Sequence, residues 1–314
     1  MAGVFAKAKN LLSQKNYAEL RQKVIFYLRY MALRFWFFCT GKEWDSNLKK
    51  TKKHWITYTY LQAKYKNFLK TYPRQKNATH EYSDIVWWCW LQGEENAPDI
   101  CKKCLASARK HLSHKKIIVI TQENMFDYVQ FPDYIMEKYQ KGIITRTQFS
   151  DLLRLQLLVT HGGTWLDATV LLTGYPAYAF DSPLFFLQSR DKEDPAVVGQ
   201  SWFLVAEKNE PILTLTRDMI FDYWKTHSYQ LHYFIIYFFF SIAARFYAEE
   251  WKAVPFYSDV PTFAMERELL DEYTEKRFSQ LCAMADIHKL SYKIEKHAEN
   301  RYTFYEFILQ RHEP

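Results

Sequence analysis

The segment Phe149–Leu172, FSDLLRLQLLVTHGGTWLDATVLL, contains the change of periodicity that decides the fold. Its first half repeats leucine at helical spacing, which predicts a helix with a wide apolar face over Thr147–Thr160. Gly162 and Gly163 follow, and glycine is typical of a helix end because it adopts left-handed conformations at little cost. The second half, Thr164–Leu172, is apolar with β-branched residues, which predicts a buried strand.

Strands and helices alternate on both sides of this segment. Apolar runs predict strands at Asp84–Trp90, Lys116–Thr121 and Leu184–Gln188. Helical periodicity predicts helices at Pro98–His114 and Tyr134–Lys141. Strand, helix, strand, helix, strand at this spacing is typical of an α/β domain, so we expect a mainly parallel mixed sheet flanked by helices. Beyond the last of these strands, we expect the chain to be mostly helical to its end.

Charge divides the chain into two parts. Residues 1–80 hold 17 Lys and Arg against 3 Asp and Glu, whereas residues 81–314 hold 25 against 32. A polar stretch at Thr71–Ser83 includes Pro73 and is typical of a linker. We therefore expect a basic, helical N-terminal segment over 1–80 and an α/β domain over 81–314. A basic segment beside an acidic body predicts a negatively charged partner.

The basic segment contains an amphipathic stripe. A basic, aromatic helix of this kind is typical of helices that lie on an anionic membrane surface, but the stripe is equally compatible with packing on the body of the protein. The run Val24–Cys39 is too short to span a membrane and contains Arg29 and Arg34. Nucleic acid is not expected as a partner, because no nucleic-acid-binding module accompanies the stripe. The stripe consists of Val24, Tyr27, Leu28, Met31, Phe35 and Phe38.

Cysteine use favours a reducing compartment. The five cysteines are scattered and odd in number, which does not suit a disulfide framework. Cys101 and Cys104 have metal-like spacing, but no second pair completes the four ligands that structural zinc needs. Met1–Asn10 is followed by polar residues rather than by the apolar core of a secretory signal, so we expect a cytoplasmic protein.

Asp167 is the unusual residue of the central segment. A lone carboxylate inside an apolar strand is costly unless it is paired or bound to a metal. Asp151 and Arg154 lie three residues apart on the preceding helix and share a face. One interpretation is a buried Asp167–Arg154 ion pair that ties helix to strand. The other is a ligand site at the end of a strand, where open α/β sheets bind ligands.

The central segment also resembles the core motif of the family 32 glycosyltransferases and, more closely, of the capsular polysaccharide synthesis protein family. The shared order of residues is Ser150, Asp151, Arg154, Gly162, Gly163, Trp165, Leu166 and Asp167. Four further stretches are similar to the same family in the same order, and they are Ile85–Gly93, Phe131–Phe149, Ser201–Trp224 and Ile287–Lys293. The resemblance therefore extends from Asp84 to Lys293.

This resemblance implies a GT-A-type, Rossmann-like fold that binds a UDP-linked nucleotide sugar. The residues it assigns to the donor are Trp87, Trp90, Gln92, Asp151, Arg154, Lys289 and Lys293. It assigns catalytic roles to Asp151, Arg154 and Asp167. It also implies that Asp167 faces either the ribose or a divalent metal, and that His288 is either a ligand of that metal or a phosphate contact. The metal, Mn²⁺ or Mg²⁺, would be held by Asp167 and His288 and would bridge two phosphate oxygens.

Two positions depart from the family pattern. Thr169 stands where an Asp-X-Asp-type element carries its second carboxylate, and a hydroxyl is a weak metal ligand. Either Asp167 and His288 hold the metal together with water and phosphate, or the dependence on metal is weak. His232 lies near a position where an Asp is expected. It serves either as a base near neutral pH or as a hydrogen-bonded core residue.

Together, these features predict a retaining glycosyltransferase of the bacterial cytoplasm, peripherally attached to the inner face of the plasma membrane. The expected acceptor is a glycan or lipid-linked glycan precursor, such as that of a capsular polysaccharide. Retention, donor and acceptor are implied by the resemblance alone. The alternative is a catalytically inactive, transferase-like scaffold recruited to the membrane, which the missing second carboxylate at Thr169 motivates.

Overall fold

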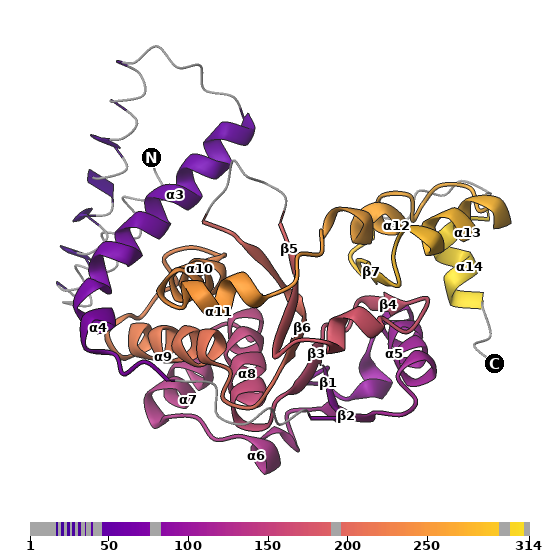
Figure 1. The fold of residues 1–314 in the computed structure, drawn as a ribbon, viewed down its shortest axis with the longest axis horizontal. Coiled ribbons are helices and arrows are strands. Elements are labelled where there is room, and N and C mark those ends of the chain that lie inside the picture. Colours follow the sequence, from indigo (N-terminus) through magenta and orange to yellow (C-terminus); the bar gives the residue numbers. More distant parts are fainter. Residues whose placement is uncertain are drawn as a thin grey trace.

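The computed structural model describes scattered positions from 17 to 39 and then residues 46–75, 83–189, 196–294 and 302–310. A five-stranded sheet stands between two groups of helices, so the described chain has three layers (Figure 1). The strands of this sheet are β1 (Ile85–Cys89), β2 (Lys116–Ile120), β3 (Gly163–Leu166), β5 (Leu184–Gln188) and β6 (Gly199–Ala206). A second sheet of two strands consists of β4 (Val170–Leu172) and β7 (Ile287–Lys289).

The strand order of the large sheet is β2-β1-β3-β6-β5. β1 pairs in parallel with both β2 and β3. β6 pairs antiparallel with β3 and with β5, so β5 runs in the same direction as the first three strands and only β6 is reversed. The predicted α/β fold with a mainly parallel mixed sheet flanked by helices is therefore confirmed.

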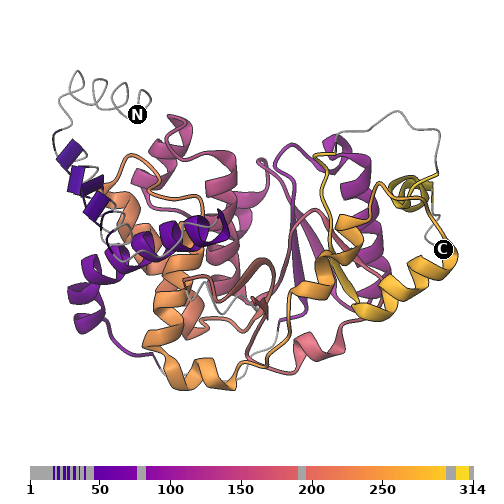
Figure 2. The ribbon, with the colours of Figure 1, turned by 90° about the horizontal axis from the view of Figure 1, so that it is seen from above.

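The alternation of side chains along the strands creates two cores. Trp87 and Trp165 face the layer that contains the central helix, whereas Val86, Trp88 and Leu166 face the opposite layer. Figure 2 shows the two layers on either side of the sheet, with the C-terminal elements packed on the second one. Both faces of the sheet are covered, which explains why its strands are apolar throughout.

The helices of the first layer are α3 (Ser46–Lys64), α4 (Lys66–Thr71), α6 (Met125–Tyr128), α7 (Asp133–Gln140), α8 (Arg146–His161), α9 (Pro211–Thr226), α10 (Ile235–Phe246) and α11 (Ala248–Ala253). Those of the second layer are α5 (Asp99–His111), α12 (Ala264–Arg267), α13 (Glu275–Met284) and α14 (Phe304–Gln310). The helices predicted around the central segment are confirmed, with ends that differ by a few residues. The mainly helical C-terminal half also contains β6 and β7, which periodicity did not predict.

The central segment differs from expectation at its strand. Thr164–Leu172 was predicted as one strand, but β3 ends at Leu166 and β4 begins at Val170 in a different sheet. Between them the Val170 amide donates to the Asp167 carbonyl at 3.0 Å, which closes a turn. The prediction of a carboxylate inside a strand was therefore wrong, because Asp167 lies at the carboxyl end of β3.

Gly163 explains how β3 fits beside β1. Its φ of 98° lies in the left-handed region, and a Cβ placed there would come within 2.4 Å of the Ile85 carbonyl oxygen. Gly162 also has a positive φ, 68°, as its place after α8 predicts. Two consecutive glycines therefore let the chain leave the helix and enter the sheet directly.

The N-terminal basic segment does not separate cleanly from the body. Three residues of this segment are buried in the same core as α10: Tyr58 and Leu61 of α3, and Tyr65, which follows α3. The expected domain boundary at residue 80 stays a prediction. Helix α3, although it precedes that boundary, packs into the core formed by residues that follow it.

The described positions between 17 and 39 are helical. Five members of the amphipathic stripe are exposed: Val24, Tyr27, Leu28, Met31 and Phe35. The sixth, Phe38, lies outside the described residues. Within the described chain, no helix is both long and apolar enough to cross a membrane.

Candidate active site at the carboxyl end of β3

Two charged residues enter the site from α8. Thr145 caps this helix, since its hydroxyl accepts from the Gln148 amide and the Gln148 side chain accepts from the Thr145 amide. This capping box fixes where the helix begins. Asp151 and Arg154 then lie on one face, with 3.2 Å between the Asp151 Oδ1 and Arg154 Nη2 atoms.

Asp167 reaches the same place from the end of β3. Its Oδ1 accepts from the Trp165 indole at 2.8 Å and lies 3.4 Å from Nη1 of Arg154. The ion pair that one interpretation of the sequence predicted is therefore present. The Asp167 side chain is 24% exposed, whereas that of Arg154 is only 7% exposed. The carboxylate thus lies at the border between the core and solvent, and the guanidinium lies below it.

Lys289 completes the cluster from the far end of the chain. β7 pairs with β4 so that Lys289 stands opposite Val170, and the Leu290 amide donates to the Thr169 carbonyl at 2.8 Å. The Lys289 ammonium donates to Asp167 Oδ2 at 3.0 Å and to the Thr169 hydroxyl at 2.6 Å. Sequence reasoning assigned Lys289 to the donor but did not predict that it binds Asp167.

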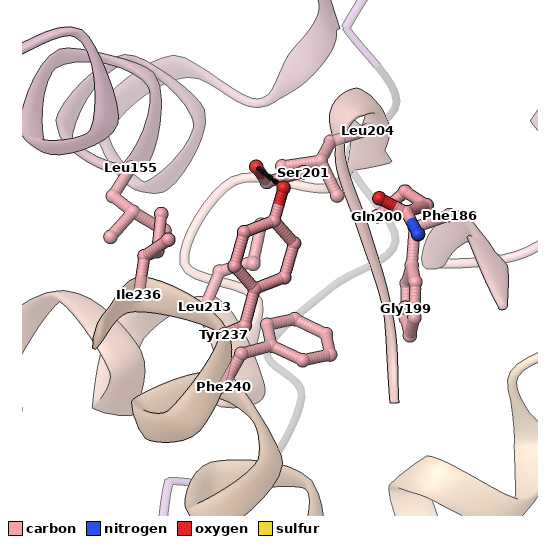
Figure 3. Close-up of a pocket in the computed structure, with 10 residues that line it drawn as sticks. All are labelled: Leu155, Phe186, Gly199, Gln200, Ser201, Leu204, Leu213, Ile236, Tyr237 and Phe240. Atoms are coloured by element: carbon pink, nitrogen blue, oxygen red, sulfur yellow. Dashed lines mark hydrogen bonds between the residues drawn. The ribbon is translucent and has the colours of Figure 1, made fainter. Parts of the chain in front are cut away.

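Arg154 is held in place by β6. Its Nη1 donates to the Ser201 carbonyl at 2.5 Å and to the Ser201 hydroxyl at 3.0 Å. The Ser201 hydroxyl in turn donates to the Tyr237 hydroxyl of α10 at 3.0 Å, which Figure 3 shows as a dashed line above the ring of Phe240. The family resemblance includes Ser201, but the sequence predicted neither its bond to Arg154 nor the contribution of Tyr237.

The two carboxylates have pKa values displaced in opposite directions. Burial, opposed by Arg154 and assisted by the charge of Asp167, raises the pKa of Asp151 to about 6. Burial would raise the pKa of Asp167 as well. The nearby Lys289 and Arg154 charges and the Trp165 hydrogen bond outweigh it and hold that pKa below its usual value. Asp167 is therefore ionised at neutral pH, and Asp151 titrates close to neutrality, a separation typical of catalytic sites.

The residues expected to hold a divalent metal do not come together. His288 precedes Lys289 on β7, so its ring points to the opposite face of that strand from the ammonium that binds Asp167. The ring is fully buried, its Nε2 lies 3.0 Å from the Thr173 hydroxyl, and burial lowers its pKa to about 4. Among the described residues, no group of three or more His, Cys, Asp and Glu could hold a metal ion. The described residues therefore do not fit a metal at Asp167 and His288, although the metal requirement itself stays a prediction.

The residues expected to face the nucleotide divide into two groups. Trp87 is fully buried in the α8 core, and its indole donates to the Gly162 carbonyl at 2.9 Å. Trp90 follows β1 at the sheet edge where Asp167 lies, and its ring meets that of Tyr292 edge-on at 5.6 Å between centroids. This geometry suits Trp90 for a ligand and Trp87 for the core.

The other two nucleotide candidates lie at the surface. Gln92 is exposed in the turn after β1, and Lys293 is exposed after β7 with its ammonium 5.8 Å from the centre of the Tyr292 ring. The contact of Trp90 with Tyr292 brings these two turns together. Tyr233 is largely exposed, and partial burial together with the charge of Asp151 raises the pKa of its hydroxyl. The sequence did not predict Tyr233 or Tyr292 as site residues, because single aromatic residues in loops carry no periodic signal.

His232 packs against α3. Its ring contacts those of His54 and Phe238, and its Nδ1 accepts from the Phe234 amide at 3.1 Å. Burial, with the charges of His54 and Lys53, lowers its pKa to about 4. These contacts favour the interpretation of a hydrogen-bonded structural histidine over that of a base.

Comparison with known proteins agrees with the resemblance in the motif. Over residues 41–308 the sequence matches the family described as capsular polysaccharide synthesis protein. The chain belongs to this family. The match begins upstream of α3 and ends within α14, so it includes every element that contributes to the charged cluster.

Comparisons outside the family add little. No curated protein matches the sequence. Among the solved structures that match, one titled "PaToxG Glycosyltransferase" is 13% identical over 65% of this chain and 80% of that chain, with a TM-score of 0.38. A likeness this distant carries no argument about activity.

Proposed function

We propose that the chain is a glycosyltransferase that binds a nucleotide sugar, UDP-linked, at the carboxyl end of β3. The observation that carries the proposal is the convergence of four charged residues at this edge: Asp151 and Arg154 from α8, Asp167 from the end of β3, and Lys289 from the distant strand β7. Ligands of open α/β sheets bind at the carboxyl ends of the strands. Family membership supports a role in glycan assembly.

The charges of the cluster suit sugar transfer. The reaction breaks the bond between the anomeric carbon and the terminal phosphate oxygen, and the diphosphate leaves with the electron pair. An acceptor hydroxyl oxygen forms the new glycosidic bond, and its proton passes to the departing diphosphate. Lys289 and Lys293 would stabilise the negative charge that develops on the diphosphate, and they would do so more strongly in the transition state than in the ground state.

Asp151 and Arg154 would position the donor sugar. A carboxyl whose pKa is about 6 can, near neutral pH, accept a hydrogen bond from a sugar hydroxyl or donate one to it. Arg154 is fixed by Ser201 and has little freedom to lose when a ligand binds. We propose retention of anomeric configuration and a glycan or lipid-linked acceptor, both on the strength of the family resemblance.

A donor panel tests this proposal. Calorimetry and hydrolysis assays with UDP- and GDP-sugars should detect one donor that binds and is slowly hydrolysed. Asp167→Asn should abolish turnover while the protein stays folded, since the amide no longer carries the charge that pairs with Lys289 and Arg154. Absence of binding and hydrolysis across the whole panel would refute the proposal.

We propose further that the N-terminal stripe attaches the chain to an anionic membrane, where a lipid-linked acceptor would lie. The exposed side chains of Leu28 and Phe35 support this role, because they are not packed on the body. The full chain should sediment with anionic vesicles and be released by high salt. Leu28→Asp combined with Phe35→Asp should abolish binding, and unchanged sedimentation of this variant would contradict the attachment.

The inactive scaffold remains the second candidate function. It is favoured by the fact that both oxygens of Asp167 already have partners within the protein. In that case the cluster would only tie α8, β3 and β7 together. Membrane binding in the absence of any nucleotide-sugar binding would support the scaffold.

A further inference from the structure

The position at which a metal was expected is filled by a side chain. In an Asp-X-Asp-type element, the first and third residues face the cation, and these are Asp167 and Thr169 in this chain. The Lys289 ammonium bonds to both of them, at 3.0 Å and 2.6 Å. One positive charge therefore bridges the two positions that a divalent ion would bridge.

We propose that Lys289 is the resident cation of the donor site and that the chain binds the diphosphate of its donor without a divalent metal. This inference rests on the proposed function, because it concerns the same nucleotide-sugar site. It differs from the family expectation in placing the Lys289 ammonium, rather than a divalent ion, between Asp167 and Thr169.

The contacts of Asp167 leave little room for a metal. Its Oδ1 is bonded to the Trp165 indole and lies beside Arg154, and its Oδ2 is bonded to Lys289. A divalent ion would have to displace a bonded ammonium and would then lie near a buried guanidinium. Like charges at such distances repel strongly where solvent screening is weak.

The substitution at Thr169 fits the same arrangement. A second carboxylate at this position would provide a strong metal ligand, whereas a hydroxyl simply accepts a hydrogen bond from Lys289. The β4–β7 ladder holds the lysine backbone opposite Val170, so the ammonium is delivered by a fixed strand rather than by a loop. An ammonium has three N–H donors, and the two contacts with protein leave one for a phosphate oxygen.

The test compares binding of UDP, with GDP as a second probe, to the full chain in excess EDTA and in Mn²⁺. We expect the same affinity in both. Lys289→Met should weaken UDP binding about 10- to 100-fold, the usual range for loss of a charge-assisted contact. Lys289→Arg should retain much of the affinity. The control Lys252→Met, which removes an exposed lysine paired with Glu249 on α11, should have no effect.

A second measurement follows the binding of Mn²⁺, first to the ligand-free protein. Electron paramagnetic resonance of Mn²⁺ should detect no binding to the ligand-free wild type, whereas Lys289→Met combined with Thr169→Asp should bind Mn²⁺ and make UDP binding depend on it. Circular dichroism would establish that each variant is folded.

Several outcomes separate the inference from the proposed function. UDP affinity that rises about tenfold or more in Mn²⁺, or wild-type Mn²⁺ binding that Asp167→Asn abolishes, would overturn the inference and leave the transferase proposal standing. Absence of binding by any nucleotide in both EDTA and Mn²⁺ would instead refute the nucleotide site itself, and the inference with it.

Discussion

Replacement of Arg154 by methionine tests the charged cluster most directly. The substitution keeps most of the side-chain volume but removes the partner of both Asp151 and Asp167 and the donor to the Ser201 carbonyl. Because the Arg154 side chain is 7% exposed, its loss removes the ion pair of a largely buried Asp151 and leaves Asp167 with Lys289 and the Trp165 indole. Breaking a buried ion pair from one side typically costs about 3–5 kcal/mol.

The magnitude can be expressed as a shift in melting temperature. At roughly 2–4 °C per kcal/mol for a large domain, the Arg154→Met variant should melt on the order of 10 °C lower. The matched control is Arg109→Met. Arg109 makes a two-bonded pair with Glu94 at 2.7 Å, but its side chain is 51% exposed. Loss of such a surface pair should cost about 0.2–1 kcal/mol.

Differential scanning fluorimetry of both variants at pH 7.5 and one scan rate would measure the difference. If the two variants melted at similar temperatures, the cluster would contribute no more than a surface ion pair, and the account of a buried network would be refuted. Combining Arg154→Met with Asp167→Asn should be less destabilising than the sum of the single changes, because it removes one of the stranded charges.

Three further predictions concern Asp151, Gly163 and Trp87. The folded state binds a proton on Asp151 more tightly than the unfolded chain between its usual pKa of 3.8 and its raised pKa of about 6. Its contribution to stability is therefore present at low pH and lost as pH rises through this window. As pH rises through the same window, the melting temperature of wild type should fall relative to that of Asp151→Asn. Gly163→Ala should destabilise the fold by about 3 kcal/mol or more, because its φ is 98° and the new Cβ would lie 2.4 Å from the Ile85 carbonyl. Gly142→Ala, where φ is also positive but no atom lies within 4 Å, should cost only about 1 kcal/mol in urea unfolding. Trp87→Phe should destabilise the fold by about 1–3 kcal/mol, because the hydrogen bond to the Gly162 carbonyl is lost. The same variant should bind UDP with unchanged affinity. Weaker UDP binding would indicate that Trp87 contacts the nucleotide.

The sequence predicted the parts of the fold that carry a local period. The α8 helix, the two glycines and the strands β1, β2 and β5 are encoded by leucine spacing and by apolar runs, and the structure places them as expected. The Asp167–Arg154 pair could also be predicted, because an apolar neighbourhood requires a partner for the carboxylate. These features depend on residues that are close in the sequence.

The parts that were missed depend on distant residues. β7 has three residues, too few for any period to be recognised, yet it places Lys289 against Asp167. The family resemblance assigned Trp87 to the nucleotide, but Trp87 and Trp88 of β1 are both fully buried, one in each core. The end of β3 at Leu166 follows from pairing with β6, a strand that itself was not predicted.

The span between Asp167 and Lys289 has a consequence for the order in which the protein acquires its site. The two residues are 122 positions apart, and at about 5–20 residues per second the ribosome needs roughly 6–24 s to proceed from one to the other. During that interval α8 and β3 are already made, but Asp167 and Thr169 have no ammonium partner. A chain whose synthesis stops early retains the helix, the glycine turn and the carboxylates, and lacks the cation. Competence to bind a nucleotide sugar would thus report that translation has gone nearly to completion.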